Sequence, residues 1–273
     1  MSDYSVVHGT KVQNFSSDPP APSVGQVWYN TTTNIAKYLV FNPGTWASGG
    51  NLNTARIQLA GTGTQTAALA IGGSVSPLAQ NELYNGSAWT ELNDLNTGRS
   101  SLDASGTSTA ALAFGGFNAS DPQTRDDTET WNGTNWTEVN NLNTERNLIS
   151  GCGTNTAALA FGGNTGPGEV TELWNGTNWT EVNNLNTSRR ELGGSGTSTS
   201  AVGFGGANAR VQTETWNGTN WTSVGDMAAG RQELGDAGAN TSAALAFGGY
   251  PPNPSNATEE FNSGPAVSTL GAE

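Results

Sequence analysis

The chain has 273 residues and a formal net charge of −13, and it contains 37 Gly, 9 Trp, one His and one Cys. Without a cluster of Lys or Arg, the chain is poorly suited to nucleic acid or anionic membranes as partners, and no apolar run approaches the ~20 residues of a membrane helix. A single Cys excludes an internal disulfide framework, and one His with one Cys leaves no ligand set for zinc or copper.

The first 34 residues differ in character from the rest of the chain. They begin with no basic segment followed by an apolar one, so we expect no cleaved signal peptide. Residues 18–23 read Asp-Pro-Pro-Ala-Pro-Ser, which is typical of an extended polyproline-like segment. We therefore predict an extended arm over residues 1–34 and a folded domain over residues 35–273.

From residue 35 onwards the chain is repetitive. A Gly-Gly pair, a Trp and an Arg ten residues after that Trp recur together, with a period of about 43 residues. The repeated residues are Trp46, Trp89, Trp136, Trp179 and Trp221; Arg56, Arg99, Arg146, Arg189 and Arg231; and Glu82, Glu129, Glu172, Glu214 and Glu259. This period is the size of a four-stranded blade of a β-propeller.

Each repeat predicts four short strands and no helix. The second strand alternates side chains between two buried faces, with Leu69 and Ile71 on one face and Ala68 and Ala70 on the other. An Asn-Gly pair between the third and fourth strands predicts a two-residue hairpin turn of type I′. In one repeat, the first strand is expected over residues 189–196 and the second over residues 200–206. In the repeat before it, the third strand is expected over residues 169–174 and the fourth over residues 179–183.

The predicted fold is all-β: a propeller of five blades, each with four antiparallel strands. The last repeat lacks the Trp of its fourth strand, and Trp46 lies before the first complete repeat. We expect the strand that carries Trp46 to complete the last blade, which removes the exposed sheet edges. The alternative is six blades, one of them an incomplete blade over residues 26–50.

The order of landmarks resembles the kelch repeat: Trp, then Leu-Asn-Thr-x-Arg, then a strand of small residues ending in Gly-Gly, then Glu-x-aromatic. The resemblance covers residues 35–264. Ahead of it, the sequence Gly-Gln-Val-Trp-Tyr-Asn-Thr-Thr-Thr over residues 25–33 looks like a short module of phage tail and fibre proteins. The whole pattern is similar to the kelch-like structural proteins of tailed phages.

The loops after the second strands are the irregular part of the repeat. In a blade of alternating strand direction, these loops lie on the same face as the loops after the fourth strands. Recognition usually uses irregular loops on a rigid scaffold, so we predict that this face binds a partner. The candidate binding residues are Phe117, Asp121, Arg125, Asp126, Asp127, Arg210 and Tyr250.

Other polar residues receive a structural interpretation. One Arg and one Glu per repeat, at constant offsets, indicate a repeated structural contact rather than an anion-binding ring. Carboxylates are plentiful, but nearly all follow the repeat, so we expect no unique acid–base pair near the axis of the propeller. The acids Asp121, Asp126 and Asp127 match no known calcium loop, and Cys152 falls at a small core position.

The resemblance implies a non-enzymatic phage virion protein of the tail, a fibre or another surface appendage, without cofactor or metal. It is made in the host cytoplasm and located in the virion. Residues 1–34 would attach it to other virion proteins, and the variable loops would bind protein or a host-surface glycan; a homo-oligomer is compatible with this arrangement. The alternatives are a capsid decoration protein without a receptor role and a glycan-active propeller enzyme.

Overall fold

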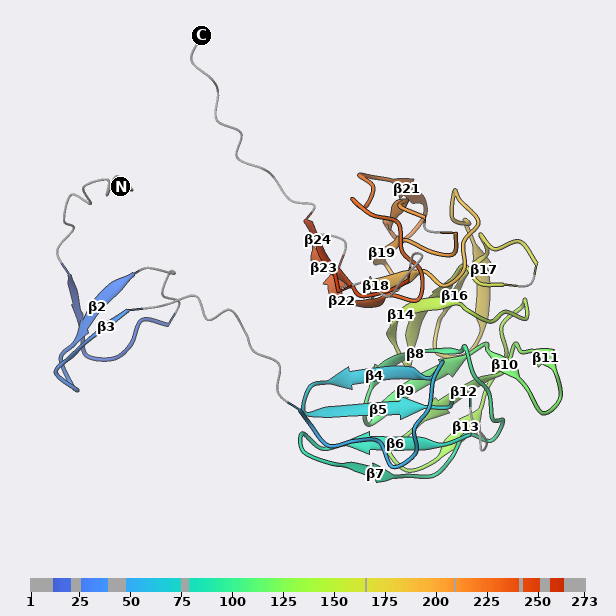
Figure 1. Cartoon of the computed structure of the whole chain (residues 1–273), viewed down its shortest axis with the longest axis horizontal. Coiled ribbons are helices and arrows are strands. Elements are labelled where there is room, and N and C mark those ends of the chain that lie inside the picture. The colour runs from blue at the N-terminus through green and yellow to red at the C-terminus, as the bar shows by residue number, and fades with distance from the viewer. Residues whose placement is uncertain are drawn as a thin grey trace, which may run out of the picture. The chain divides into compact units, whose positions relative to one another are not determined.

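The computed structural model describes residues 12–20, 26–38, 48–74, 79–164, 166–208, 210–240, 243–250 and 256–262. Within these residues there are 24 strands and no helix, which confirms the all-β prediction (Figure 1). Contacts divide the chain into a unit Met1–Ser48 and a unit Gly49–Glu273.

The N-terminal unit contains a folded sheet, whereas the sequence predicts an extended arm over residues 1–34. Strand β2 (Val27–Asn30) pairs in parallel with β1 (Gln13–Phe15) and antiparallel with β3 (Ile35–Tyr38). The carboxylate of Asp18 accepts hydrogen bonds from the side chains of three residues of this sheet, Trp28, Asn30 and Lys37.

The predicted boundary at residues 34 and 35 is therefore wrong, because β3 lies beyond it yet belongs to this sheet. The described strands of residues 26–50, the range of the alternative sixth blade, also differ from an antiparallel blade. Strands β2 and β3 belong to a sheet with a parallel pair, in a unit separate from the repeats.

The repeats form five antiparallel sheets in which sequential strands are neighbours. The first sheet contains β4 (Ala60–Thr64), β5 (Ala67–Ile71), β6 (Asn81–Tyr84) and β7 (Trp89–Glu91). The second contains β8 (Asp103–Thr107), β9 (Ala110–Phe114), β12 (Thr128–Trp131) and β13 (Trp136–Glu138). The third contains β14 (Ser150–Thr154), β15 (Ala157–Phe161), β16 (Thr171–Trp174) and β17 (Trp179–Val182).

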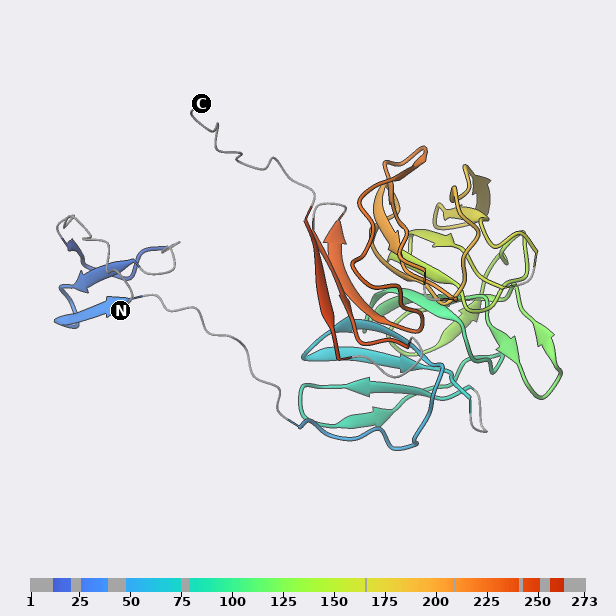
Figure 2. The ribbon, with the colours of Figure 1, turned by 45° about the horizontal axis from the view of Figure 1, so that its top comes forward.

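The fourth sheet contains β18 (Gly193–Thr197), β19 (Ser200–Phe204), β20 (Thr213–Trp216) and β21 (Trp221–Ser223). The fifth has three strands in the described residues: β22 (Gly235–Asn240), β23 (Ala243–Phe247) and β24 (Thr258–Asn262). Trp46, the predicted source of its fourth strand, lies outside the described residues. The first strands of successive sheets pack side by side in the order β4, β8, β14, β18 and β22 (Figures 1 and 2).

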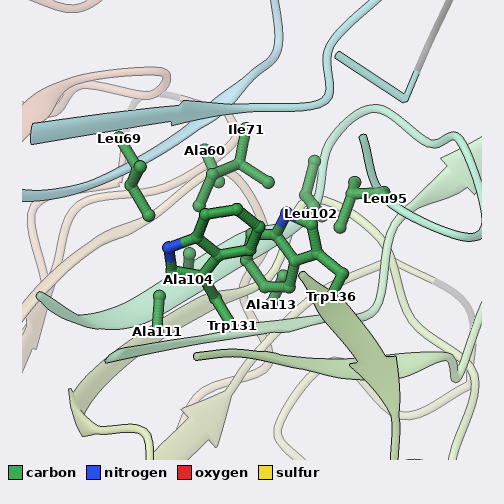
Figure 3. Packing of buried hydrophobic residues seen from close by; sticks show 10 residues of the cluster. All are labelled: Ala60, Leu69, Ile71, Leu95, Leu102, Ala104, Ala111, Ala113, Trp131 and Trp136. Carbon is green, nitrogen blue, oxygen red and sulfur yellow. The ribbon is translucent and has the colours of Figure 1, made fainter. Parts of the chain in front are cut away.

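The core lies between neighbouring sheets, as the alternation in the second strands predicts. Residues of β9 and β15 are almost entirely buried on both faces, and Leu112, Phe114, Leu159 and Phe161 are 0% exposed. Figure 3 shows the indoles of Trp131 and Trp136 between small residues of the second sheet and aliphatic residues of the first. Thin sheets of Ala and Gly therefore pack around aromatic side chains.

Two local predictions are corrected. The segment Leu-Asn-Thr-x-Arg precedes the first strand rather than belonging to it, so Arg189 lies outside β18 (Gly193–Thr197). The turn between third and fourth strands has four residues, because Trp174 pairs directly with Trp179. Gly176 alone takes a positive φ there, of 92°, and the side chain of Asn175 accepts the N–H groups of residues 177 and 178.

Candidate functional site

One Arg–Glu pair anchors each repeat, as its structural interpretation predicts. In the third repeat, Nη2 of Arg146 lies 2.9 Å from Oε1 of Glu172, and its Nη1 donates to the carbonyls of Gly162 and Val170. The other carboxylate oxygen accepts two hydrogen bonds from Asn143, at 2.7 and 2.8 Å. Each Arg of the set pairs with the Glu of its own sheet: Arg56–Glu82, Arg99–Glu129, Arg146–Glu172, Arg189–Glu214 and Arg231–Glu259.

The loops after the second strands all close at the same point. The first Gly of each Gly-Gly pair donates its N–H to a carbonyl just before the third strand, irrespective of loop length. The bonded pairs are Gly72–Gln80, Gly115–Asp127, Gly162–Val170, Gly205–Gln212 and Gly248–Ala257. We call the surface formed by these loops the variable-loop face.

Bridges tie this face to the segments that enter the first strands. Isolated β-bridges join Ile57 to Ser74, Ser100 to Phe117, Asn147 to Asn164, and Gln232 to Tyr250. The loops after the second strands and those after the fourth strands therefore lie at one end of the sheets. The loops at the other end follow the first and third strands and repeat the sequences Gly-Thr and Asn-Gly-Thr-Asn.

Five of the seven predicted binding residues belong to one loop. Phe117 begins a small hairpin of β10 (Phe117–Asn118) and β11 (Gln123–Thr124). Nη2 of Arg125 lies 3.2 Å from Asp121, and its Nε lies 3.8 Å from Asp127. Asp126 uses its backbone carbonyl to accept the N–H of Leu142. These contacts order the hairpin.

The other two predicted residues lie on later repeats. Arg210 is half-buried in the loop of the fourth repeat. Tyr250 is 47% exposed in the loop of the fifth repeat. The structure thus places all seven residues on the variable-loop face, in the second, fourth and fifth repeats.

A cavity that the sequence pattern does not predict lies at this end of the sheets. All five repeats line it with equivalent residues: Ile57, Gln58, Leu59, Ser101, Leu102, Leu148, Ile149, Glu191, Leu192, Glu233 and Leu234. Its volume is about 570 Å³, within the usual range for small-molecule sites. Aliphatic side chains form most of the wall, with a few polar groups among them.

The backbone around this cavity is strained in a regular way. One non-glycine residue per repeat, two positions after the repeated Arg, has a positive φ between 50° and 57°. The N–H of each donates to the carbonyl of the preceding one: Ser101 to Gln58, Leu148 to Ser101, Glu191 to Leu148 and Glu233 to Glu191. Left-handed non-glycine residues persist where surrounding contacts fix them, often at functional sites. The residue two positions after each repeated Arg differs between repeats, and this variation is the sequence signal for the strained position.

Two carboxylates interrupt the small residues of the first strands, a departure that the repeat pattern does not predict. Asp103 follows the cavity-lining Leu102, and Asp236 lies two residues after Leu234. Asp103 accepts N–H groups from Ala104 at 2.8 Å and from Gly151 of the next sheet at 2.6 Å. Asp236 accepts the N–H of Gly194 at 3.2 Å. The repeat masked both acids, because neither falls on the Glu positions.

The environment of Asp103 predicts a pH-dependent stability. Burial, with the negative charge of Asp236, raises the pKa of Asp103 from 3.8 to about 8. The native state then holds a proton that the unfolded chain has lost, so this contribution is complete below pH 4 and is lost as the pH rises through 8. We expect the unfolding free energy of the wild type, relative to Asp103→Asn, to fall by up to about 1.4 kcal/mol per pH unit in that window. Urea unfolding at pH 5 and pH 8 measures this, and parallel pH profiles would contradict it.

Cys152 is a core residue, as predicted. It is 7% exposed, and its thiol donates to the carbonyl of Thr197 at 3.5 Å. Burial is the main cause that raises the pKa of this thiol, which makes it a poor nucleophile.

Comparison with known proteins adds no assignment: no protein-family model matches the sequence, and no curated protein matches it. Within the described residues, no helix is long and apolar enough to span a membrane. No group of three or more His, Cys, Asp or Glu in that part of the chain is arranged to hold a metal ion.

Proposed function

We propose that this protein is a non-enzymatic binding protein of a phage virion, and that it binds its partner through the variable-loop face. The observation that carries the binding role is the contrast between the two ends of one repeated scaffold. One end repeats its turns, whereas the other varies in loop length, charge and aromatic content around a cavity. The virion assignment is supported by the similarity of the N-terminal module and the repeats to phage structural proteins.

We further propose that the five sheets form a five-bladed propeller of the kelch type. Two observations support this arrangement: the first strands pack in sequence, and equivalent residues of all five repeats line one cavity. In this arrangement the strand carrying Trp46 supplies the fourth strand of the last sheet.

A tryptophan slot that recurs between the described sheets supports this role for Trp46. In the third and fourth sheets, Trp179 and Trp221 pack on Phe114 and Phe161 of the preceding sheet. Their Nε1 atoms donate to Thr128 and Thr171, each at 3.0 Å. The equivalent pair, Phe204 and Thr213, lines a cavity that Phe261 and Met227 also border.

A double-mutant cycle tests the closure. We expect Trp46→Phe and Thr213→Val to show a coupling of about 1 kcal/mol, the usual value of one net hydrogen bond. The cycle of Trp221→Phe with Thr171→Val, measured by denaturant unfolding, is the matched reference. Additive effects of the first pair, alongside coupling in the second, would show that Trp46 does not fill the slot.

Attachment assays test the binding role. We expect labelled full-length protein to bind cells in a panel of bacterial strains, and Arg125→Ala with Tyr250→Ala to abolish that attachment. The first substitution releases the ordered hairpin, and the second removes an exposed aromatic side chain. Thr134→Ala with Thr177→Ala, at the opposite end of the sheets, is the matched control and should bind normally.

Two outcomes would contradict this proposal, the first its receptor role and the second its binding surface. Absence of cell binding, together with many copies per particle, would favour a decoration protein. Attachment that survives the Arg125 and Tyr250 substitutions would move the binding surface elsewhere.

A further inference from the structure

Positive charge is scarce in the unit Gly49–Glu273, and most of it is already neutralised. Five of its eight Arg residues form the buried pairs with Glu. Arg125 lies between two aspartates of its own hairpin. Arg190 and Arg210 are the remaining two, and both belong to the fourth repeat.

These two residues line the same pocket on the variable-loop face. Its volume is about 190 Å³, and it lies between the loops that follow the second strands of the third and fourth repeats. Asn164, Ser188 and Asn208 contribute polar side chains to the wall. We call this site, with Arg190 and Arg210, the basic pocket.

The charges of the basic pocket are poorly compensated from within the protein. Nε of Arg190 lies 3.5 Å from Oε1 of Glu191, and the Arg190 side chain is 45% exposed, so that pair contributes little. Among the described residues, no carboxylate lies within ion-pairing distance of Arg210. Arg189 also lines the pocket, and Glu214 pairs with its guanidinium group at 2.9 Å. Two guanidinium groups without a strong ion-pair partner among the described residues, Arg190 and Arg210, thus lie in one repeat of an acidic protein.

The backbone of the basic pocket is held in place before any ligand arrives. Asn164 pairs with Asn147, and the N–H of Arg189 donates to the carbonyl of Gly168. The N–H of Asn208 donates to Gln232, and that of Arg210 to Gly206. A pre-formed wall lowers the entropic cost of binding.

We propose that the basic pocket binds the carboxylate of an acidic saccharide. A guanidinium group matches a carboxylate in charge and in its two-pronged geometry, and the hydroxyl and amide side chains suit the hydroxyl groups of a sugar. The described residues of the lining include no aromatic or large aliphatic side chain, whereas the anchoring pockets of protein–protein interfaces are enriched in such residues. This inference rests on the proposed binding role, because it names a ligand class for the same face.

Calorimetry on the full chain at low salt tests the inference. The probes are an oligosaccharide of glucuronic acid and the neutral glucose oligosaccharide of the same length and linkage. We expect the acidic probe to bind at least tenfold more tightly than the neutral one. Arg210→Gln should weaken the acidic probe at least tenfold, with Arg190→Gln as a second variant and Arg210→Lys in between. Lys37→Gln, which makes the same change in net charge in the N-terminal unit, should leave the affinity unchanged.

Several results would overturn the inference. They are equal affinity for the two probes, no binding of the acidic probe, an affinity unaffected by Arg210→Gln and Arg190→Gln, or equally tight binding of a glutamate-rich peptide. If any of these occurs while the protein still attaches to cells through Arg125 and Tyr250, the ligand class is wrong and the binding role stands. If the protein neither binds the acidic probe nor attaches to cells, the binding role itself is wrong.

Discussion

Replacing Glu172 by Gln should destabilise the protein by about 3–5 kcal/mol, the usual effect of removing one partner of a buried ion pair. Glu172 is 0% exposed, and its two oxygens accept from Arg146 and from Asn143. Burial lowers the pKa of Arg146, and the charge of Glu172 opposes that change. Without the carboxylate, a buried guanidinium group is left with neutral acceptors alone.

Denaturant unfolding followed by tryptophan fluorescence measures this loss. Glu145→Gln is the matched control, since Glu145 is exposed in the segment that carries Asn143 and Arg146, and such substitutions change stability by less than about 0.5 kcal/mol. The double variant Arg146→Met with Glu172→Leu should recover much of the loss, because no unpaired charge is then buried. A double variant as unstable as Glu172→Gln would show that the hydrogen bonds to loop carbonyls, rather than charge compensation, stabilise the repeat.

Replacing Trp179 by Ala should cost about 3–5 kcal/mol, as for other buried Trp residues. Its ring lies 5.2 Å from that of Phe114 in the preceding sheet and 5.4 Å from that of Trp174 in its own. Truncation would therefore open a cavity between two sheets.

Conservative variants separate packing from hydrogen bonding. Trp179→Phe should cost about 1 kcal/mol through the lost donor to Thr128. Trp136→Phe should cost less, because Nε1 of Trp136 has no hydrogen-bond partner in the described part of the chain. Equal costs for the two substitutions would mean that the indole contributes through its size alone.

The repeat made the sheets predictable from sequence. Coupled positions of Trp, Arg and Glu report contacts that recur in every repeat, and the structure confirms the third- and second-strand assignments and the Arg–Glu interpretation. A consensus of the repeats averages over their differences and therefore hides what is particular to one repeat. Asp103 and Asp236 occupy positions that are Ser, Gly or Ala elsewhere, and a consensus removes them.

Other features were missed because their cause is not local. The positive φ of Leu148 or Glu191 follows from hydrogen bonds to neighbouring repeats, and neither residue type favours that conformation. The Asn-Gly turn took a four-residue form because the Trp pair on either side fixed the register. In the N-terminal unit, the parallel partner of β2 lies upstream of a proline-rich stretch, and short-range patterns do not report such pairings.

The common closing bond of the variable loops has a consequence for how such a protein can change. The N–H of Gly115 donates to the carbonyl of Asp127, and that of Gly205 donates to the carbonyl of Gln212, across loops of different length. The scaffold therefore ends at the same point in both repeats. The carbonyls of Arg125 and Arg210 also accept the N–H groups of Arg146 and Arg231, so the end of each loop is fixed as well. An insertion or deletion before those two residues leaves the Arg–Glu pairs and the aromatic packing in place. New surface chemistry can therefore arise by exchange of whole loops, one repeat at a time, without a search for a new fold.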